Sequence, residues 1–135
     1  MAEQNIVIVC GGRNYNDRAT VYKVLDQLQP DWVVIGACGV DADTLDWKRI
    51  RGADRLAYDW VHQPNRSARW LIMRPAAWKR LGKKAGPIRN RQMANEFPTA
   101  TVVAFPGGKG TANMVSIACE LGMTVRHVTV EGALI

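Results

Sequence analysis

The chain of 135 residues contains little that would anchor it in a membrane or stabilise it by cross-links. Three cysteines, an odd number without metal-type spacing, exclude a disulfide framework and favour a reducing compartment. No apolar run approaches the roughly 20 residues that a membrane-spanning helix needs. The first residues also lack the basic segment of a signal peptide. We therefore expect a cytoplasmic protein without a membrane partner.

Metal ligands are sparse as well. The two histidines, His62 and His127, lie far apart in the sequence. Asp41, Asp43 and Asp46 recur at short intervals, but the glycine and glutamate of a calcium-binding loop do not accompany them. We therefore predict no metal site and no required cofactor.

Acidic residues are absent from one long stretch, between Trp60 and Asn95. A solvated surface accounts for some of the basic residues there, yet so one-sided a segment favours an anionic partner, either a phosphorylated small molecule or nucleic acid. The stretch holds nine of the 18 lysines and arginines, in a chain of net charge +6: Arg66, Arg69, Arg74, Lys79, Arg80, Lys83, Lys84, Arg89 and Arg91.

Strand and helix signals alternate along the chain. Near-continuous apolar runs predict strands buried on both faces, at 6–10, 32–35, 70–73, 101–105 and 123–130. Helical patterns lie between and after them. This order predicts an α/β protein: one domain over residues 1–135, a Rossmann-like three-layer sandwich around a mainly parallel sheet.

The most informative motif follows the fourth predicted strand, at Phe105-Pro106-Gly107-Gly108-Lys109-Gly110-Thr111. Glycines let the backbone approach an anion closely, and the first N–H groups of the next helix lack partners within it. The helix dipole adds a favourable field, and Thr111 either caps the helix or donates its hydroxyl to a ligand. The alternative is a plain turn with Gly108 and Gly110 at positive φ. We favour a phosphate site.

Other distinctive residues follow the remaining strands. Because the carboxyl ends of parallel strands share one edge of a sheet, and ligands bind at that edge, these segments should form one pocket. The predicted ligand-binding residues are Gly11, Gly12, Arg13, Gly36, Asp54, Trp78, Arg91, Pro106, Gly107, Gly108, Gly110 and Thr111.

Several of these residues have two interpretations. Asp54, in the first turn of its helix, either interacts with free N–H groups or holds a ribose hydroxyl. Arg13 either closes over a phosphate or is solvated. Trp78, in a predicted loop, either stacks on a base or anchors the loop. Arg89 and Arg91 point about 200° apart on a helix, so only one of them should face the pocket.

Four motifs follow one another along nearly the whole chain. They are Gly11-Gly12-Arg13-Asn14-Tyr15, Gly52-Ala53-Asp54-Arg55-Leu56-Ala57, Ala85-Gly86-Pro87-Ile88-Arg89-Asn90-Arg91-Gln92-Met93 and Pro106-Gly107-Gly108-Lys109-Gly110-Thr111. Together they resemble the SLOG superfamily and in particular its YspA-related branch. The resemblance implies a Rossmann-like sheet, a nucleotide-derived ligand and a homodimer or higher homo-oligomer. Relatives include the Lonely Guy phosphoribohydrolases and DNA-processing protein A, which binds single-stranded DNA.

The Lonely Guy enzymes use an arginine before the glycine turn and a glutamate just inside the next helix. By this resemblance the arginine position falls on Arg91, with Arg89 left to an interface or a salt bridge. The glutamate position is held by Met114, beside Asn113. Methionine cannot move a proton or stabilise an oxocarbenium-like centre, so we do not expect the same chemistry. If the protein is an enzyme, Asp54 and Arg91 are its catalytic candidates.

Two features depart from the family's pattern. Residues 37–51 form an insertion before the Gly-Ala-Asp turn, at the ligand edge of the sheet, where a lid or a contact with a partner subunit would lie. Ala77 stands where relatives commonly have an acidic residue before the tryptophan, so any ligand contact made by that acid is missing.

The sequence therefore predicts a module that senses or sequesters a phosphorylated nucleoside or a ligand derived from NAD or ADP-ribose. A hydrolase of an N-glycosidic or phosphate bond in such a ligand is the first alternative. Single-stranded nucleic-acid binding by the basic segment is the second.

Overall fold

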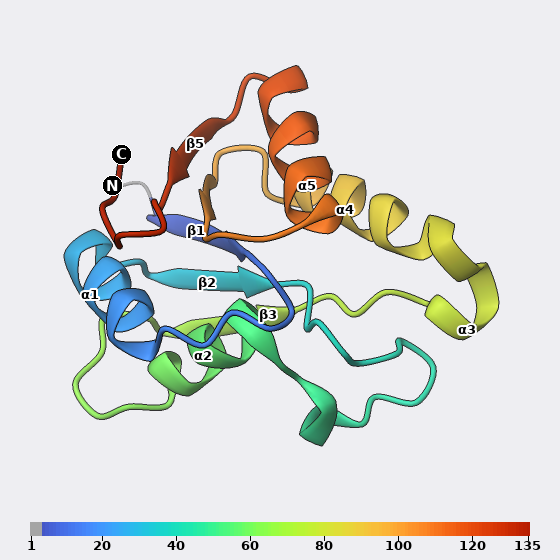
Figure 1. Ribbon diagram of the computed structural model, residues 1–135, viewed down its shortest axis with the longest axis horizontal. Coiled ribbons are helices and arrows are strands. Elements are labelled where there is room, and N and C mark those ends of the chain that lie inside the picture. Colours follow the sequence, from blue (N-terminus) through green and yellow to red (C-terminus); the bar gives the residue numbers. More distant parts are fainter. Residues whose placement is uncertain (1–3) are drawn as a thin grey trace.

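The centre of the protein is a parallel sheet, seen in a computed structural model that describes residues 4–135 (Figure 1). Five strands lie in the order β3-β2-β1-β4-β5, and every neighbouring pair is parallel. The predicted α/β class and Rossmann-like architecture are confirmed, and the sheet is entirely parallel. The strands are β1 (Ile6–Cys10), β2 (Trp32–Ile35), β3 (Trp70–Met73), β4 (Thr101–Ala104) and β5 (Thr124–His127).

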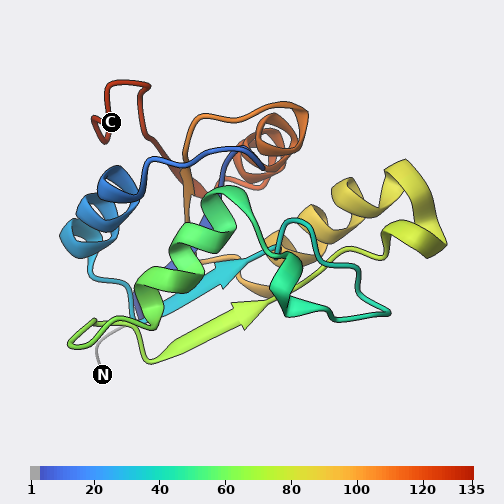
Figure 2. The same ribbon diagram turned by 60° about the horizontal axis from the view of Figure 1, so that its bottom comes forward.

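Helices cover both faces of the sheet, which gives the three predicted layers (Figures 1 and 2). Helices α1 (Arg18–Leu28) and α2 (Gly52–Val61) pack on one face, and α4 (Ala85–Glu96) and α5 (Lys109–Glu120) pack on the other. Shorter helical turns are η1 (Trp47–Arg49), α3 (Trp78–Leu81) and η2 (Gly82–Lys84). Trp78, predicted to lie in a loop, is instead the first residue of α3.

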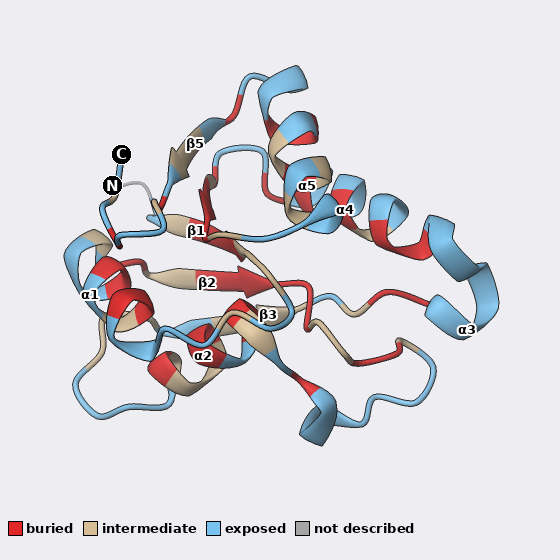
Figure 3. Cartoon of the chain, viewed as in Figure 1, coloured by how far each residue is buried: buried red, intermediate tan, exposed pale blue. Residues whose placement is uncertain are grey.

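The central strands supply two cores because side chains alternate along a strand. Val7 and Val9 of β1 contact the core under α1 and α2, whereas Ile8 contacts the core under α4 and α5. Figure 3 shows this burial in β1, β2 and β4, while β3 and β5 at the sheet edges are less buried. The continuous apolar runs of the sequence thus reflect strands covered on both faces.

The strand order reverses between β1 and β4. The chain passes from β1 through α1 to β2 on one side, and β4 with α5 and β5 lies on the other. Loops that leave these two neighbouring strands diverge toward opposite faces and leave a crevice at the carboxyl edge of the sheet. The turn after β1 and the glycine turn (residues 106–111) after β4 border this crevice.

No described helix has both the length and the apolar composition that are needed to cross a bilayer.

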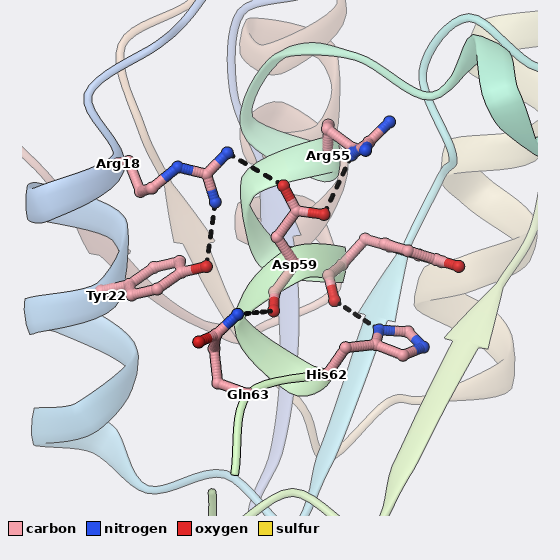
Figure 4. A network of polar contacts seen from close by, with 7 residues as sticks. Arg18, Tyr22, Arg55, Asp59, His62 and Gln63 are labelled. Atoms are coloured by element: carbon pink, nitrogen blue, oxygen red, sulfur yellow. Dashed lines mark hydrogen bonds and ion pairs between the residues drawn. The ribbon is translucent and has the colours of Figure 1, made fainter.

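A polar network joins α1 to α2 on the outside of the fold (Figure 4). The carboxylate of Asp59 accepts a hydrogen bond from Arg18 at 2.9 Å and one from Arg55 at 2.9 Å. Arg18 also donates to the Tyr22 hydroxyl at 2.9 Å. Asp59 therefore holds one ion pair that joins α2 to α1 and one within α2.

Replacing Asp59 by alanine should lower the free energy of unfolding by about 1 kcal/mol, because partly exposed ion pairs contribute little each and this change removes two. Arg55→Ala removes only the pair within α2 and should cost about 0.3–0.5 kcal/mol. Urea denaturation of the three proteins measures both. Identical midpoints for Asp59→Ala and the wild type would show that the network contributes nothing.

Candidate functional site

A cavity of about 1110 Å³ opens at the carboxyl edge of the sheet. Its walls come from the turn after β1, the glycine turn, the first turns of α2 and α5, the N-terminal half of α4, and segments of the 37–51 insertion and of α3 and η2. Small-molecule sites usually enclose about 300–1,000 Å³, so this cavity is slightly larger than that range.

Most of the predicted site residues do come together here. Those that line the cavity are Gly11, Gly12, Arg13, Gly36, Asp54, Trp78, Gly108, Gly110 and Thr111. Pro106 and Gly107 do not line it but hold the glycine turn in place. The Pro106 carbonyl accepts a hydrogen bond from the Gly12 N–H at 2.9 Å. A Cβ on Gly107 would overlap the Thr111 hydroxyl.

The glycine turn is open toward the cavity. Gly108 and Gly110 do not have positive φ, so the prediction of a plain turn with that geometry is wrong. A Cβ on either residue would meet no other atom within 4 Å, so packing inside the protein does not explain them either. No side chain caps α5, which leaves its first N–H groups accessible. The turn therefore presents bare backbone to whatever enters the cavity.

Asp54 is placed at the cavity wall by a close contact between two segments. The Ala53 N–H, in the first turn of α2, donates to the Gly12 carbonyl at 3.1 Å. Gly52 has φ +69°, and a Cβ there would overlap Gly12 and Arg13. Only a glycine fits this junction, which fixes the start of α2 and aims the next carboxylate into the cavity.

The residue Asp54 is 7% exposed. Its Oδ2 accepts a hydrogen bond from the Cys38 N–H at 2.9 Å, and within residues 4–135 its Oδ1 accepts none. Burial raises the pKa of Asp54 to about 6, although the Cys38 N–H and the positive charge of Arg89 act in the opposite direction. The side chain is therefore a buried, half-satisfied acceptor at the cavity wall.

Arg89, not Arg91, is the arginine of α4 that lines the cavity. The prediction of Arg91 is wrong because its Nη2 pairs with Glu120 Oε2 at 2.8 Å on the surface. The Arg89 guanidinium donates to the carbonyls of Gly36 and Arg74, and a Cβ on Gly36 would overlap it. Burial lowers the pKa of Arg89, which the nearby Asp54 partly offsets.

Two asparagines were missed by the sequence predictions. Asn90 and Asn113 line the cavity, and the Asn90 Nδ2 donates to Asn113 Oδ1 at 2.9 Å and to the Gly110 carbonyl at 3.3 Å. The sequence did contain a signal for Asn90. It shares a helix face with Met93, and a single polar residue on an otherwise apolar helix face indicates a specific role. The pair ties α4 to the first turn of α5.

Met114, the position where the resemblance places a glutamate, is 1% exposed and packs in the core beneath α4 and α5. It does not line the cavity, whereas the neighbouring Asn113 does. An amide transfers no proton in general acid–base catalysis. The α5 wall of the cavity therefore offers hydrogen bonds and the Lys109 ammonium group but no carboxylate.

The thiols near the cavity are unreactive by environment. Burial raises the pKa of Cys10 to about 12, and burial also raises the pKa of Cys38. Both are protonated near neutral pH, and a protonated thiol is a poor nucleophile and metal ligand. Among the described residues no group of three or more potential ligands is close enough together to hold a metal ion.

The 37–51 insertion is attached to α3 and to the segment before it. Asp41 Oδ2 accepts from the Lys79 N–H at 2.8 Å, and Asp41 Oδ1 accepts from the Asp43 N–H at 2.9 Å. The Ala42 N–H donates to the Ala76 carbonyl at 3.0 Å. Together these contacts make the insertion one side wall of the cavity.

Fold and cavity together define the class: a Rossmann-like α/β protein with a large cavity where its strand order reverses. Comparisons with protein-family models, curated proteins and solved structures show no match to this chain. The SLOG resemblance therefore stays a prediction from the four motifs.

Asp54→Asn should change how stability depends on pH. Because the pKa of Asp54 is about 6 in the folded protein and about 3.9 when unfolded, the folded state binds the proton more tightly. The wild type therefore loses stability as pH rises through that window. The variant cannot ionise, so its unfolding free energy relative to the wild type should rise by about 3 kcal/mol between the two pKa values.

Urea denaturation across this pH range measures the difference, and Asp46→Asn, at a half-exposed carboxylate on the same cavity, is the matched control. A gap between Asp54→Asn and the wild type that stays constant with pH would contradict the buried, raised-pKa carboxyl group.

Proposed function

We propose that the protein binds a phosphorylated nucleoside, or a ligand derived from NAD or ADP-ribose, and that it senses or sequesters this ligand in the cytoplasm. The observation that carries the proposal is the combination of an uncapped, glycine-lined helix start with a buried, half-satisfied carboxylate on the same cavity. The first suits a phosphate and the second a ribose hydroxyl.

In this proposal the phosphate oxygens accept hydrogen bonds from the N–H groups around Gly108–Thr111. Arg13 and Arg89 supply positive charge, with Arg89 taking the role predicted for Arg91. The free Oδ1 of Asp54 accepts a hydrogen bond from a ribose hydroxyl. An anion at a helix start is stabilised by the helix dipole and by unpaired N–H groups.

Trp78 serves both of its predicted roles in this proposal. Its ring lies against Gly86, where a Cβ would come within 2.9 Å of the ring edge, so the side chain anchors α3 to α4. It is also 42% exposed and lines the cavity. The free part of the indole is available to stack on a base.

The motif resemblance supports the same ligand class and adds the proposal of a homodimer or higher homo-oligomer. Hydrolysis of an N-glycosidic or phosphate bond is the second candidate, because Asp54, with a pKa of about 6, is suited to proton transfer near neutral pH. Chromatography of the bound ligand separates the two functions. Turnover that disappears in Asp54→Asn while binding persists would establish the hydrolase.

Thermal shift and calorimetry with a panel of AMP, ADP, NAD and ADP-ribose test the binding proposal. We expect at least one of them to raise the melting temperature. Arg89→Met should weaken its binding by about 10-fold or more, because charge-assisted hydrogen bonds to an anion contribute about 1.5–3 kcal/mol. Arg91→Met, two residues away and outside the cavity, is the matched control and should bind like the wild type.

Thr111→Val provides a second test that leaves the buried Arg89 contacts intact, and it should also weaken binding. A folded protein that responds to no member of the panel would contradict the proposal.

A further inference from the structure

The cavity has a basic wall on the side away from α5. Arg49 and Arg51 at the end of the insertion, and Lys79 and Lys83 of α3 and η2, line it together. In both Figures 1 and 2 the insertion lies apart from the start of α5. The basic wall is therefore separate from the glycine turn, although both border the same space.

The aspartates of the insertion offset only part of the positive charge of the basic wall. Asp41 is occupied by two backbone N–H groups, and Asp43 forms an ion pair with Arg80 at 3.2 Å. Asp46 accepts from the Lys48 N–H and lies 3.5 Å from Arg49.

Of the wall's four cations, only Arg49 thus has a carboxylate partner in the part of the chain that the structure describes; Arg51, Lys79 and Lys83 have none. With four cations against Asp41 and Asp46 on the same cavity, the wall keeps a net positive charge. A positive field of this kind attracts an anion.

The backbone that carries the basic wall is held in place by contacts between segments. The Arg51 N–H donates to the Cys38 carbonyl at 3.0 Å, which closes the base of the insertion. Gly39, at φ +93°, allows the Arg49 backbone to approach so closely that a Cβ would overlap the Arg49 carbonyl. At the other end, Asp41 binds the Lys79 N–H. The backbone that carries Arg49 and Arg51 is thus joined to the α3 backbone that carries Lys79, while the four side chains themselves are exposed.

We propose that the insertion and α3 form a second anion subsite, and that the ligand is a nucleotide carrying a second phosphoryl group remote from the one at the glycine turn. This inference rests on the proposed function and names its ligand class. A single phosphate would satisfy the glycine turn and leave the net positive charge of the basic wall without an anion from the ligand. A second phosphoryl group uses both the positive field and the large volume of the cavity.

The test compares adenosine 5′-monophosphate with adenosine 3′,5′-bisphosphate by calorimetry at near-physiological salt. The wild type should bind the bisphosphate about 10-fold or more tightly, because charge-assisted contacts contribute about 1.5–3 kcal/mol. The double variant Arg51→Ala with Lys83→Ala should lose this preference and retain its affinity for the monophosphate. The matched control, Arg55→Ala with Lys84→Ala, removes the same residue types outside the cavity and should keep the preference.

A second variant tests the wall without changing its charge. Ala42→Pro removes the N–H that donates to the Ala76 carbonyl and so weakens the attachment of the insertion. It should reduce the bisphosphate preference, again with little effect on the monophosphate. Circular dichroism verifies that each variant is folded.

The other outcomes overturn the inference in different ways. Equal affinity of the wild type for both compounds, or an equal loss for both in the double variant, would show that the basic wall is no separate subsite. Binding of neither compound would remove the proposed function along with it. Single-stranded DNA that displaces the bisphosphate, with affinity rising with strand length and falling steeply with salt, would assign the wall to nucleic acid.

Discussion

The close approach of three segments at the end of β1 is the constraint on which the rest of the site depends. The Gly12 N–H donates to the Pro106 carbonyl, and the Gly12 carbonyl accepts from the Ala53 N–H. A Cβ on Gly11 would lie 2.6 Å from the Ala53 Cβ, so any larger residue would force the segments apart. This junction places the glycine turn, the start of α2 and the turn after β1 around the cavity.

Charge is buried beside this junction in an unusual way. Asp54 and Arg89 are both desolvated, and each offsets part of the cost of burying the other. Burying charge that lacks full hydrogen bonding is expensive, and such groups concentrate at functional sites. The Arg89 guanidinium donates hydrogen bonds to the Gly36 and Arg74 carbonyls, whereas only one of the two carboxylate oxygens of Asp54 accepts a hydrogen bond. The protein thus holds a polar acceptor at the cavity that a ligand can satisfy.

The insertion is where this chain differs most from the pattern that its motifs resemble. Two walls of the cavity follow from the Rossmann-like topology, because strand ends and helix starts meet wherever the strand order reverses. The third wall does not follow from topology, and is built from residues 37–51 and from α3. Its attachment through Asp41 spans 38 positions in the sequence. The common scaffold would recognise a nucleotide, and the added wall would select among nucleotides.

The sequence by itself determined the five strands, because continuous apolar runs are a local pattern, although the last strand ends at His127 rather than at residue 130. The candidate pocket followed from the rule that the carboxyl ends of parallel strands share one edge of the sheet. The sequence also established that only one of Arg89 and Arg91 could face inward, from the rotation per residue of a helix. Which one does so, and that Asn113 rather than Met114 meets the cavity, depends on how α4 and α5 are rotated against the sheet. The basic wall likewise required contacts between distant segments. Side-chain direction and long-range contact are properties of packing, so only the tertiary structure decided them.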